Sequence, residues 1–285
     1  KYFKDSKKNG CVALTDFSLS NFEIEKIKKY LDNKFLHFSH VVPKSKYKTN
    51  SFFLAKNLSQ QASYSLEDIL KCEELLKILT NRQIIGLASE YFECTPTIGE
   101  LNLYWTFPKI EDNYENFSVR RYHRDVEDYK MLKFFINLTD TKKGDGGLKY
   151  IKESHNNNFL KKNLLNKKID FNENDIINSN GILNGLYNIS ELIEENFKDL
   201  ETEFYSKKGS LFAVDHYGLH KAVQAKKPRL VMWITFHLSQ FTGRQAYLNE
   251  NFKIQKRVPH SLLKNYIENN PINAFIYKSL INFES

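Results

Sequence analysis

The sequence predicts an α+β fold with a mainly β core, and two observations support this prediction. Residues 20–33, 65–79 and 81–92 carry apolar side chains at helical spacing, whereas the segments after Pro96 are short and rich in β-branched and aromatic residues. No internal repeat and no Pro- or Gly-rich linker divides the chain, so a single domain is expected over residues 1–285. Helices followed by many short strands are typical of a β-sandwich or barrel with helices packed outside it.

Residues 1–95 are expected to form a mostly helical support for the strands. A β-prone stretch comes first, over residues 11–17. In the next segment a cap at Ser20 or its neighbour precedes apolar residues at helical spacing. Ser65 has Asp68 three residues on, which resembles a capping box, and a further apolar face follows this pair.

Residues 96–240 are expected to form the β core. The expected strands lie within 97–107, 118–125, 131–140, 147–153, 209–217 and 229–238. "KKGDGG" at residues 142–147 indicates a tight turn, because glycine tolerates positive φ. Residues 156–205 are Asn- and Lys-rich with one helical patch, and a segment of this length between strands is usually a lid or binding loop. Residues 241–285 would then be a C-terminal extension.

Composition narrows the function classes. Hydrophobic residues make up 41% of the chain and aromatics 14%, which indicates a folded globular protein. The net charge of +8 suits an anionic small-molecule substrate, a nucleic acid or a membrane surface. The lysines are scattered, however, and no basic stripe alternates with aromatics. We therefore favour a lysine-rich solvated surface, and we expect a small-molecule substrate, anionic or not, with no nucleic-acid partner.

The cysteines and the hydropathy pattern predict the compartment. Cys11, Cys72 and Cys94 are odd in number and lack CxxC spacing, which argues against a disulfide framework and a zinc knuckle. No apolar stretch is long enough to cross a bilayer, and the first ten residues lack the apolar core of a signal peptide. We expect a cytoplasmic protein with no membrane partner, and the pattern leaves its oligomeric state open.

A candidate metal site begins at His123-Arg124-Asp125. On a strand, residues i and i+2 point the same way, so His123 and Asp125 would offer a nitrogen and an oxygen ligand to a metal such as Fe(II). Alone the pair is weak evidence, because about one His-x-Asp/Glu is expected by chance in this composition. His220 could complete a 2-His-1-carboxylate face, and His216, four residues earlier, is a rival for the same role.

Three further residues suit a co-substrate. A 2-His-1-carboxylate face leaves positions for a 2-oxo acid and for dioxygen, and the far carboxylate of 2-oxoglutarate needs a cation. Arg229, which opens the strand after His220, fits because its planar fork binds carboxylate through two hydrogen bonds. Lys133 and Asn137 share one face of an expected strand, and a buried lysine needs an anion such as 2-oxoglutarate. A lysine on the outer, solvated face is an equal alternative.

Residues 122–155 and 209–236 resemble the phytanoyl-CoA dioxygenase family of Fe(II)/2-oxoglutarate-dependent oxygenases. In that family a His-x-Asp pair is followed by a strand, a Gly-containing hairpin and a Pro-Gly-Ser-His-like stretch, and later by the distal His and the Arg. The resemblance covers roughly residues 100–240 and depends on the combination of both halves. One departure is that Lys152-Glu153 replaces the family's Pro-Gly, which alters a turn and no proposed ligand.

The resemblance implies a double-stranded β-helix, also called a jelly roll or cupin-like fold, with flanking N-terminal helices and a lid insertion. It implies His123, Asp125 and His220 as iron ligands and Arg229 as the clamp for 2-oxoglutarate. No catalytic residue beyond the metal ligands is predicted. Among the other histidines, His155 is expected to hold the hairpin together, while His237 is expected to be a packed or hydrogen-bonded core residue.

The function implied is that of an Fe(II)- and 2-oxoglutarate-dependent dioxygenase that also consumes O2. It would hydroxylate an aliphatic C–H bond of a small-molecule or carrier-linked substrate, with succinate and CO2 as co-products. Halogenation is not expected, because halogenases of this type have Gly or Ala where this chain has Asp125. The alternative is a non-catalytic jelly-roll binding protein, which would have no need to keep two histidines and a carboxylate converging.

Overall fold

The computed structural model describes residues 2–38, 48–108, 118–125, 128, 130–171, 189–238, 258–268 and 270–282. The helices are α1 (Tyr2–Asn9), α2 (Asn21–Leu31), α3 (Phe52–Leu58), α4 (Leu66–Lys71), α5 (Glu73–Leu79), α6 (Arg82–Phe92), α7 (Asn157–Asn166), α10 (Ser190–Asn196), α12 (Lys264–Ile267) and α13 (Pro271–Tyr277), with short 3-10 turns such as η2 (Ser118–Arg120). The strands are β1 (Cys11–Ser18), β2 (Leu36–Phe38), β3 (Lys48–Thr49), β4 (Gln61–Ser63), β5 (Thr97–Thr106), β6 (Met131–Asn137), β7 (Leu148–Ile151), β8 (Glu201–Phe204), β9 (Ser210–Asp215), β10 (His220–Ala222), β11 (Arg229–His237), β12 (Val258–Pro259) and β13 (Ile281–Asn282).

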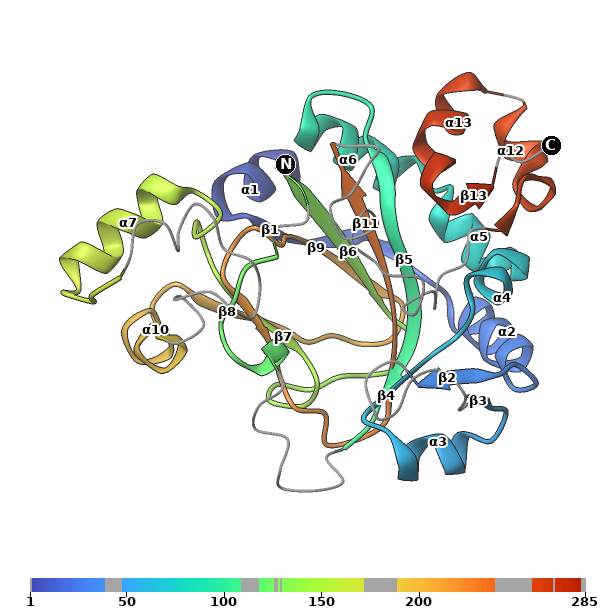
Figure 1. Ribbon diagram of the computed structural model, residues 1–285, viewed down its shortest axis with the longest axis horizontal. Coiled ribbons are helices and arrows are strands. Elements are labelled where there is room, and N and C mark those ends of the chain that lie inside the picture. The colour runs from blue at the N-terminus through green and yellow to red at the C-terminus, as the bar shows by residue number, and fades with distance from the viewer. Residues whose placement is uncertain are drawn as a thin grey trace.

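Two antiparallel sheets form the core, as the sequence predicts for a mainly β, jelly-roll protein. The larger sheet has the strand order β1-β9-β6-β11-β5-β4-β2-β3, and the smaller one has the order β10-β7-β8 (Figure 1). Strand β11 pairs with β5 on one side and with β6 on the other. Side chains of both sheets meet in one buried cluster, which includes Phe135 and Phe212 of the larger sheet and Tyr150 of the smaller.

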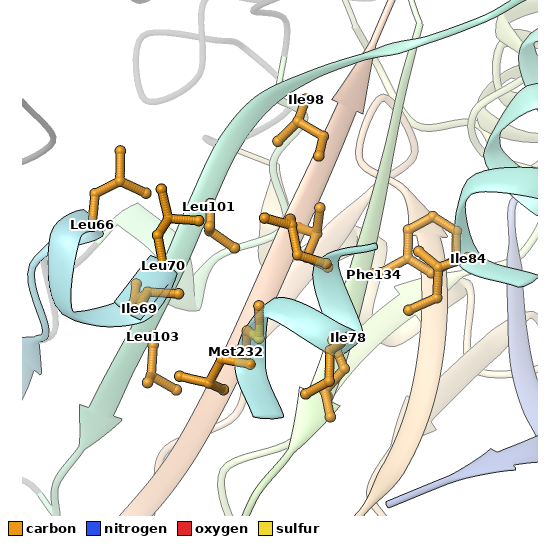
Figure 2. Close-up of a cluster of buried hydrophobic side chains, with 14 of the residues drawn as sticks. Leu66, Ile69, Leu70, Ile78, Ile84, Ile98, Leu101, Leu103, Phe134 and Met232 are labelled. Atoms are coloured by element: carbon orange, nitrogen blue, oxygen red, sulfur yellow. The ribbon is translucent and has the colours of Figure 1, made fainter. Parts of the chain in front are cut away.

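The two faces of the larger sheet have different partners because successive side chains of a strand point to opposite sides. Leu132, Phe134 and Ile136 of β6 belong to the main core cluster, which they share with the helices. Figure 2 shows α4 side chains beside Leu101 of β5, and Ile84 of α6 beside Phe134. The intervening residues of β6, among them Lys133 and Asn137, face the smaller sheet and the candidate site.

The helical support largely follows the predicted caps. Ser20 forms a capping box with Glu23 at the start of α2, and Ser65 caps α4. The single helix expected over residues 65–79 is wrong, because Cys72 has an extended ψ of 113° and separates α4 from α5. The β-prone stretch after α1 is confirmed as β1, which pairs with β9.

Two predicted connections have different outcomes. The tight turn at 142–147 is confirmed, with positive φ of 72° at Gly144 and 76° at Gly146. The strand expected over residues 118–125 is wrong, because the segment begins with the 3-10 turn η2 and contributes only one β-bridge, from His123. Glu153 has a left-handed backbone with a φ of 65°, a conformation that favours glycine.

The segment 156–205 contains α7, α10 and β8, with residues 172–188 outside the described part of the chain. Figure 1 shows α7 and α10 on the side of β7 and β8 that lies away from α4 and α5. The two helices pack in a second hydrophobic cluster, which includes Leu160, Phe197 and Leu219. Much of the expected lid is therefore packed structure, and β8 belongs to the smaller sheet.

The C-terminal extension is described from residue 258 onward. Its helices α12 and α13 contribute Ile267, Ile276 and Tyr277 to the main core. Thr97 donates a hydrogen bond to the carbonyl of Ile276, with an O–O distance of 3.2 Å, which joins α13 to the start of β5. Among the described helices, none combines the length and the apolar character needed to cross a bilayer.

Candidate metal centre

The backbone brings the three predicted ligands together. His123 and His220 form a β-bridge, with N–O distances of 3.1 and 3.0 Å in the two directions. The amide of Asp125 donates to the carbonyl of His216, at 2.9 Å. One possible ligand atom from each of His123, Asp125 and His220 lies within 4.8 Å of the other two. This bridge between distant segments, and not a regular strand at 118–125, positions the His-x-Asp pair.

Backbone carbonyls orient both imidazoles. His123 Nδ1 lies 2.8 Å from the carbonyl oxygen of Arg121, and His220 Nδ1 lies 2.9 Å from that of Gly218. Because a carbonyl oxygen can only accept, each Nδ1 carries a hydrogen, and Nε2 is the ring nitrogen left to bind a metal. The two Nε2 atoms lie 3.7 and 3.8 Å from Asp125 Oδ1, too far for hydrogen bonds but suitable for sharing one ion. Two imidazoles and a carboxylate fit a divalent first-row metal.

The second carboxylate oxygen of Asp125 is engaged elsewhere. His216 Nδ1 lies 2.7 Å from Oδ2, and Lys133 Nζ lies 3.3 Å from the same atom. Burial acts to raise the pKa of Asp125, but Lys133 and the hydrogen bond from His216 outweigh it and hold the pKa well below its ordinary value. Asp125 is therefore an ionised ligand with one oxygen directed toward the two histidines.

The neighbouring histidines are neutral. Burial, together with the charge of Lys133, lowers the pKa of His216 to about 4. Burial also lowers the pKa of His220 well below its ordinary value, and the nearby His216 and His123 add to the effect. The rival reading, in which His216 is the third ligand, is disfavoured because the group within 4.8 Å consists of His123, Asp125 and His220.

A buried cation lies at the other end of this inner face. Arg229 is 8% exposed, and its Nη2 donates to Asn137 Oδ1 at 3.1 Å. Asn137 Nδ2 donates to Ser206 Oγ at 2.7 Å, which fixes the amide with its oxygen toward the guanidinium. Arg229 Nε has no hydrogen-bond partner, and within the described residues Arg229 forms no ion pair with a carboxylate. A buried charge with so little compensation calls for an anionic ligand.

Lys133 also lies on the inner face, so the alternative of a solvated lysine is wrong. It is 5% exposed, and its Nζ lies 3.3 Å from Asp125 Oδ2 and 3.9 Å from Glu100 Oε2. The ammonium also lies 4.7 Å from the centre of the Trp233 ring. Asp125 and Glu100 thus supply the anions that a buried lysine needs, and a contact between Lys133 and 2-oxoglutarate stays a prediction.

The turn before His220 is held by a polar network that sequence reasoning missed. Asp215 accepts hydrogen bonds from the hydroxyl of Tyr91 and, at 2.8 Å, from the amide of Tyr217. A Cβ at Gly218 would collide with the hydroxyl of Tyr150, so only glycine fits there. Tyr91 and Tyr150 are distant from this turn in the sequence, so no local pattern indicated the network.

His155 and His237 lie outside the candidate metal site and have structural contacts. His155 Nε2 lies 3.0 Å from the carbonyl oxygen of Lys7, so His155 links the segment after β7 to α1. His237 is buried at the end of β11, which confirms the prediction of a packed core residue. A Cβ at Gly99 would overlap its ring, so this glycine makes room for the imidazole.

Comparison with known proteins relates this geometry to solved folds. No model of a protein family and no curated protein matches the sequence. The structure resembles the non-heme alpha ketoglutarate dependent carbocyclase SnoK from nogalamycin biosynthesis, with a TM-score of 0.55, 13% identity, and coverage of 88% of this chain and 90% of that one. It also resembles the epimerase SnoN in complex with Fe3+, alpha ketoglutarate and nogalamycin RO, with a TM-score of 0.50, 12% identity, and coverage of 83% and 82%.

A third similar structure is HygX from Streptomyces hygroscopicus with nickel, 2-oxoglutarate and hygromycin B bound. Its TM-score is 0.50 and its identity 12%, over 85% of this chain and 88% of that chain. At these identities the likeness shows a shared fold, the jelly roll on which these proteins are built, and it identifies no residue of this chain.

Proposed function

We propose that this protein is an Fe(II)- and 2-oxoglutarate-dependent oxygenase that acts on a small molecule. The observation that carries the proposal is the convergence of His123 Nε2, His220 Nε2 and Asp125 Oδ1, with both Nδ1 atoms anchored on carbonyls. Two histidines and one carboxylate with open positions are the ligand set of non-heme Fe(II) oxygenases. The proteins with which the chain shares its fold include SnoN, solved with Fe3+ and alpha ketoglutarate, and HygX, solved with nickel and 2-oxoglutarate.

Arg229 is the proposed contact for the far carboxylate of 2-oxoglutarate. Its guanidinium is buried on the same inner face as Lys133, and its Nη2 donates a hydrogen bond to a neutral amide. A dicarboxylate that reaches from the metal to Arg229 would supply the missing negative charge. Asn137 would hold the guanidinium in place through its oxygen, while Ser206 holds Asn137.

Hydroxylation is the outcome we propose among the reactions open to this class. When bound, iron with 2-oxoglutarate and O2 supplies an oxidant for an unactivated C–H bond. Asp125 would occupy one coordination position of a bound metal with an oxygen ligand, which would leave no place for chloride at that position. Because a carbocyclase and an epimerase share the fold, product mass must decide. A product that has gained one oxygen in chloride-rich buffer supports hydroxylation. A chlorinated, cyclised or epimerised product would contradict it.

The proposal is tested by adding Fe(II) and then 2-oxoglutarate under anaerobic conditions. The readout is the visible charge-transfer band of the chelate that Fe(II) forms with the 2-oxo acid. The wild-type protein should develop the band, and His123→Ala should not. His155→Ala is the matched control, because His155 lies outside the ligand group and should leave the band unchanged. A wild-type protein that binds neither Fe(II) nor 2-oxoglutarate would refute the proposal.

Turnover separates an oxygenase from a binding protein with the same site. With O2 admitted and candidate substrates added, the enzyme should release succinate in proportion to the substrate consumed. Formation of the band without succinate across a broad substrate panel would instead favour the non-catalytic binding protein.

A further inference from the structure

His216 contacts the metal site without belonging to the ligand group. It directs Nδ1 at Asp125 Oδ2 across 2.7 Å, which is the shortest of the polar contacts that Asp125 makes with described side chains. The backbone of the same residue also holds Asp125, since the Asp125 amide donates to the His216 carbonyl at 2.9 Å. One residue thus binds Asp125 at two points, by main chain and by side chain.

The two oxygens of Asp125 consequently have different environments. Oδ2 accepts from His216 and lies near Lys133, whereas Oδ1 faces the Nε2 atoms of His123 and His220. A free carboxylate can rotate about its last bond and offer either oxygen, or both. The hydrogen bond from His216 stops this rotation and leaves Oδ1 toward the two histidines.

His216 is itself held rigidly. Its ring stacks on Phe135, with 5.6 Å between ring centres and 26° between planes, and it is almost fully buried. The preceding residue, Asp215, is fixed by the hydroxyl of Tyr91 and closes the turn through the amide of Tyr217. A donor on a rigid turn holds its acceptor more accurately than one on a flexible stem.

Lys133 makes the longer and less directional of the two contacts to Oδ2. Its Nζ lies 3.3 Å from Oδ2, lies 3.9 Å from Glu100, and rests over the Trp233 ring. Its flexible stem and its second carboxylate neighbour supply charge to the site with less directional control. The geometric constraint on Asp125 is therefore assigned to His216.

We propose that His216 is a positioning residue that orients Asp125 for one-oxygen coordination, through the hydrogen bond from its Nδ1. The inference rests on the proposed metal site. Outer partners of metal ligands typically contribute 10- to 100-fold to metal affinity. His216 therefore contributes to metal affinity without binding the ion.

Two substitutions separate the hydrogen bond from the packing of the ring. His216→Phe keeps an aromatic ring to stack on Phe135 but removes the donor. His216→Asn places its amide nitrogen near the position of Nδ1, so it keeps a donor but loses the ring. Co(II) serves as the probe, because its affinity and its visible d–d spectrum report the ligand set without turnover.

The hydrogen bond predicts a specific order of affinities. Co(II) affinity should fall about 10- to 100-fold in His216→Phe and stay within about threefold of wild type in His216→Asn. The d–d spectrum should change in the Phe variant and not in the Asn variant. The melting temperatures should have the opposite order, with His216→Asn lower than His216→Phe, because the Asn variant loses the ring that packs on Phe135.

Tyr91→Phe is the control for disturbance of the turn. It removes a buried hydrogen bond to Asp215 and should lower the melting temperature, while Co(II) affinity should fall far less than in His216→Phe because the Nδ1 donor is still present. Equal Co(II) affinity in wild type and His216→Phe would overturn the positioning role. A Co(II) affinity of His216→Asn as low as that of His216→Phe would also overturn it. Both results would leave the proposed function standing. A wild-type protein that fails to bind Co(II) would remove the proposed function as well.

Discussion

Replacing Arg229 by methionine should abolish tight binding of 2-oxoglutarate without destabilising the ligand-free protein. Methionine keeps most of the length of the side chain and removes the charge. In the wild type the guanidinium is 8% exposed, its Nη2 bonds to the neutral amide of Asn137, and its Nε has no partner. A buried charge that has only a neutral amide as its hydrogen-bond partner costs folding free energy, so its removal should leave the melting temperature of the free protein equal or higher.

The effect on the ligand follows from the same geometry. Truncating one partner of a buried, hydrogen-bonded charge pair costs about 2–5 kcal/mol, which is roughly 30-fold to several thousandfold in the Kd for 2-oxoglutarate. The assay is calorimetric titration of 2-oxoglutarate into metal-loaded protein under anaerobic conditions. Melting temperatures are measured in parallel with and without the ligand.

Arg124 provides a matched control because it is a second buried arginine whose guanidinium makes more hydrogen bonds than that of Arg229. Its guanidinium donates to Asn157 Oδ1 at 2.8 Å and to the carbonyl of Ser154, and it lies over the Tyr217 ring. Arg124→Met leaves the buried carbonyl of Ser154 and the half-buried amide oxygen of Asn157 without this donor, and it should cost about 1–3 kcal/mol of folding free energy. A destabilised Arg229→Met protein that still binds 2-oxoglutarate at wild-type affinity would refute the reasoning.

Three further predictions concern the ligand set, a turn and the segment outside the smaller sheet. Asp125→Ala should lose Co(II) binding by at least about 100-fold, measured by titration, and retention of the wild-type affinity would contradict its role as a ligand. Glu153→Gly should raise the melting temperature by about 2–4 °C, because it relieves a left-handed residue at about 1 kcal/mol, and a fall would contradict this. Phe197→Ala should lower the free energy of unfolding by about 3–5 kcal/mol in a denaturant titration, and an unchanged value would mean that α10 is a detachable lid.

The fold class was predictable because alternation and helical spacing are local properties of the sequence. The switch after Pro96 marks the point where helices give way to strands, and alternate residues of β6 do face opposite sides. The break at Cys72 was not predictable in this way. The apolar pattern continues through it, and the extended backbone there depends on tertiary packing.

The residues of the candidate site were predicted more accurately than the backbone geometry that brings them together. His123 and Asp125 were assigned to one strand, but the structure holds them through a single bridge to His220 and a backbone bond to His216. The role of His216 depends on which ring nitrogen meets which oxygen. Spacing along the chain contains no information about that orientation, so sequence reasoning could only name His216 as a rival ligand.

A crystal structure with Mn(II) and 2-oxoglutarate bound without oxygen tests the central claim most directly, because Mn(II) is a close substitute for Fe(II) at oxygen and imidazole ligands. The ion should bond to Nε2 of His123, Nε2 of His220 and Oδ1 of Asp125, with the far carboxylate of 2-oxoglutarate in a two-pronged contact with Arg229. An ion held by His216 with His220 turned away, or a co-substrate that avoids Arg229, would contradict the account.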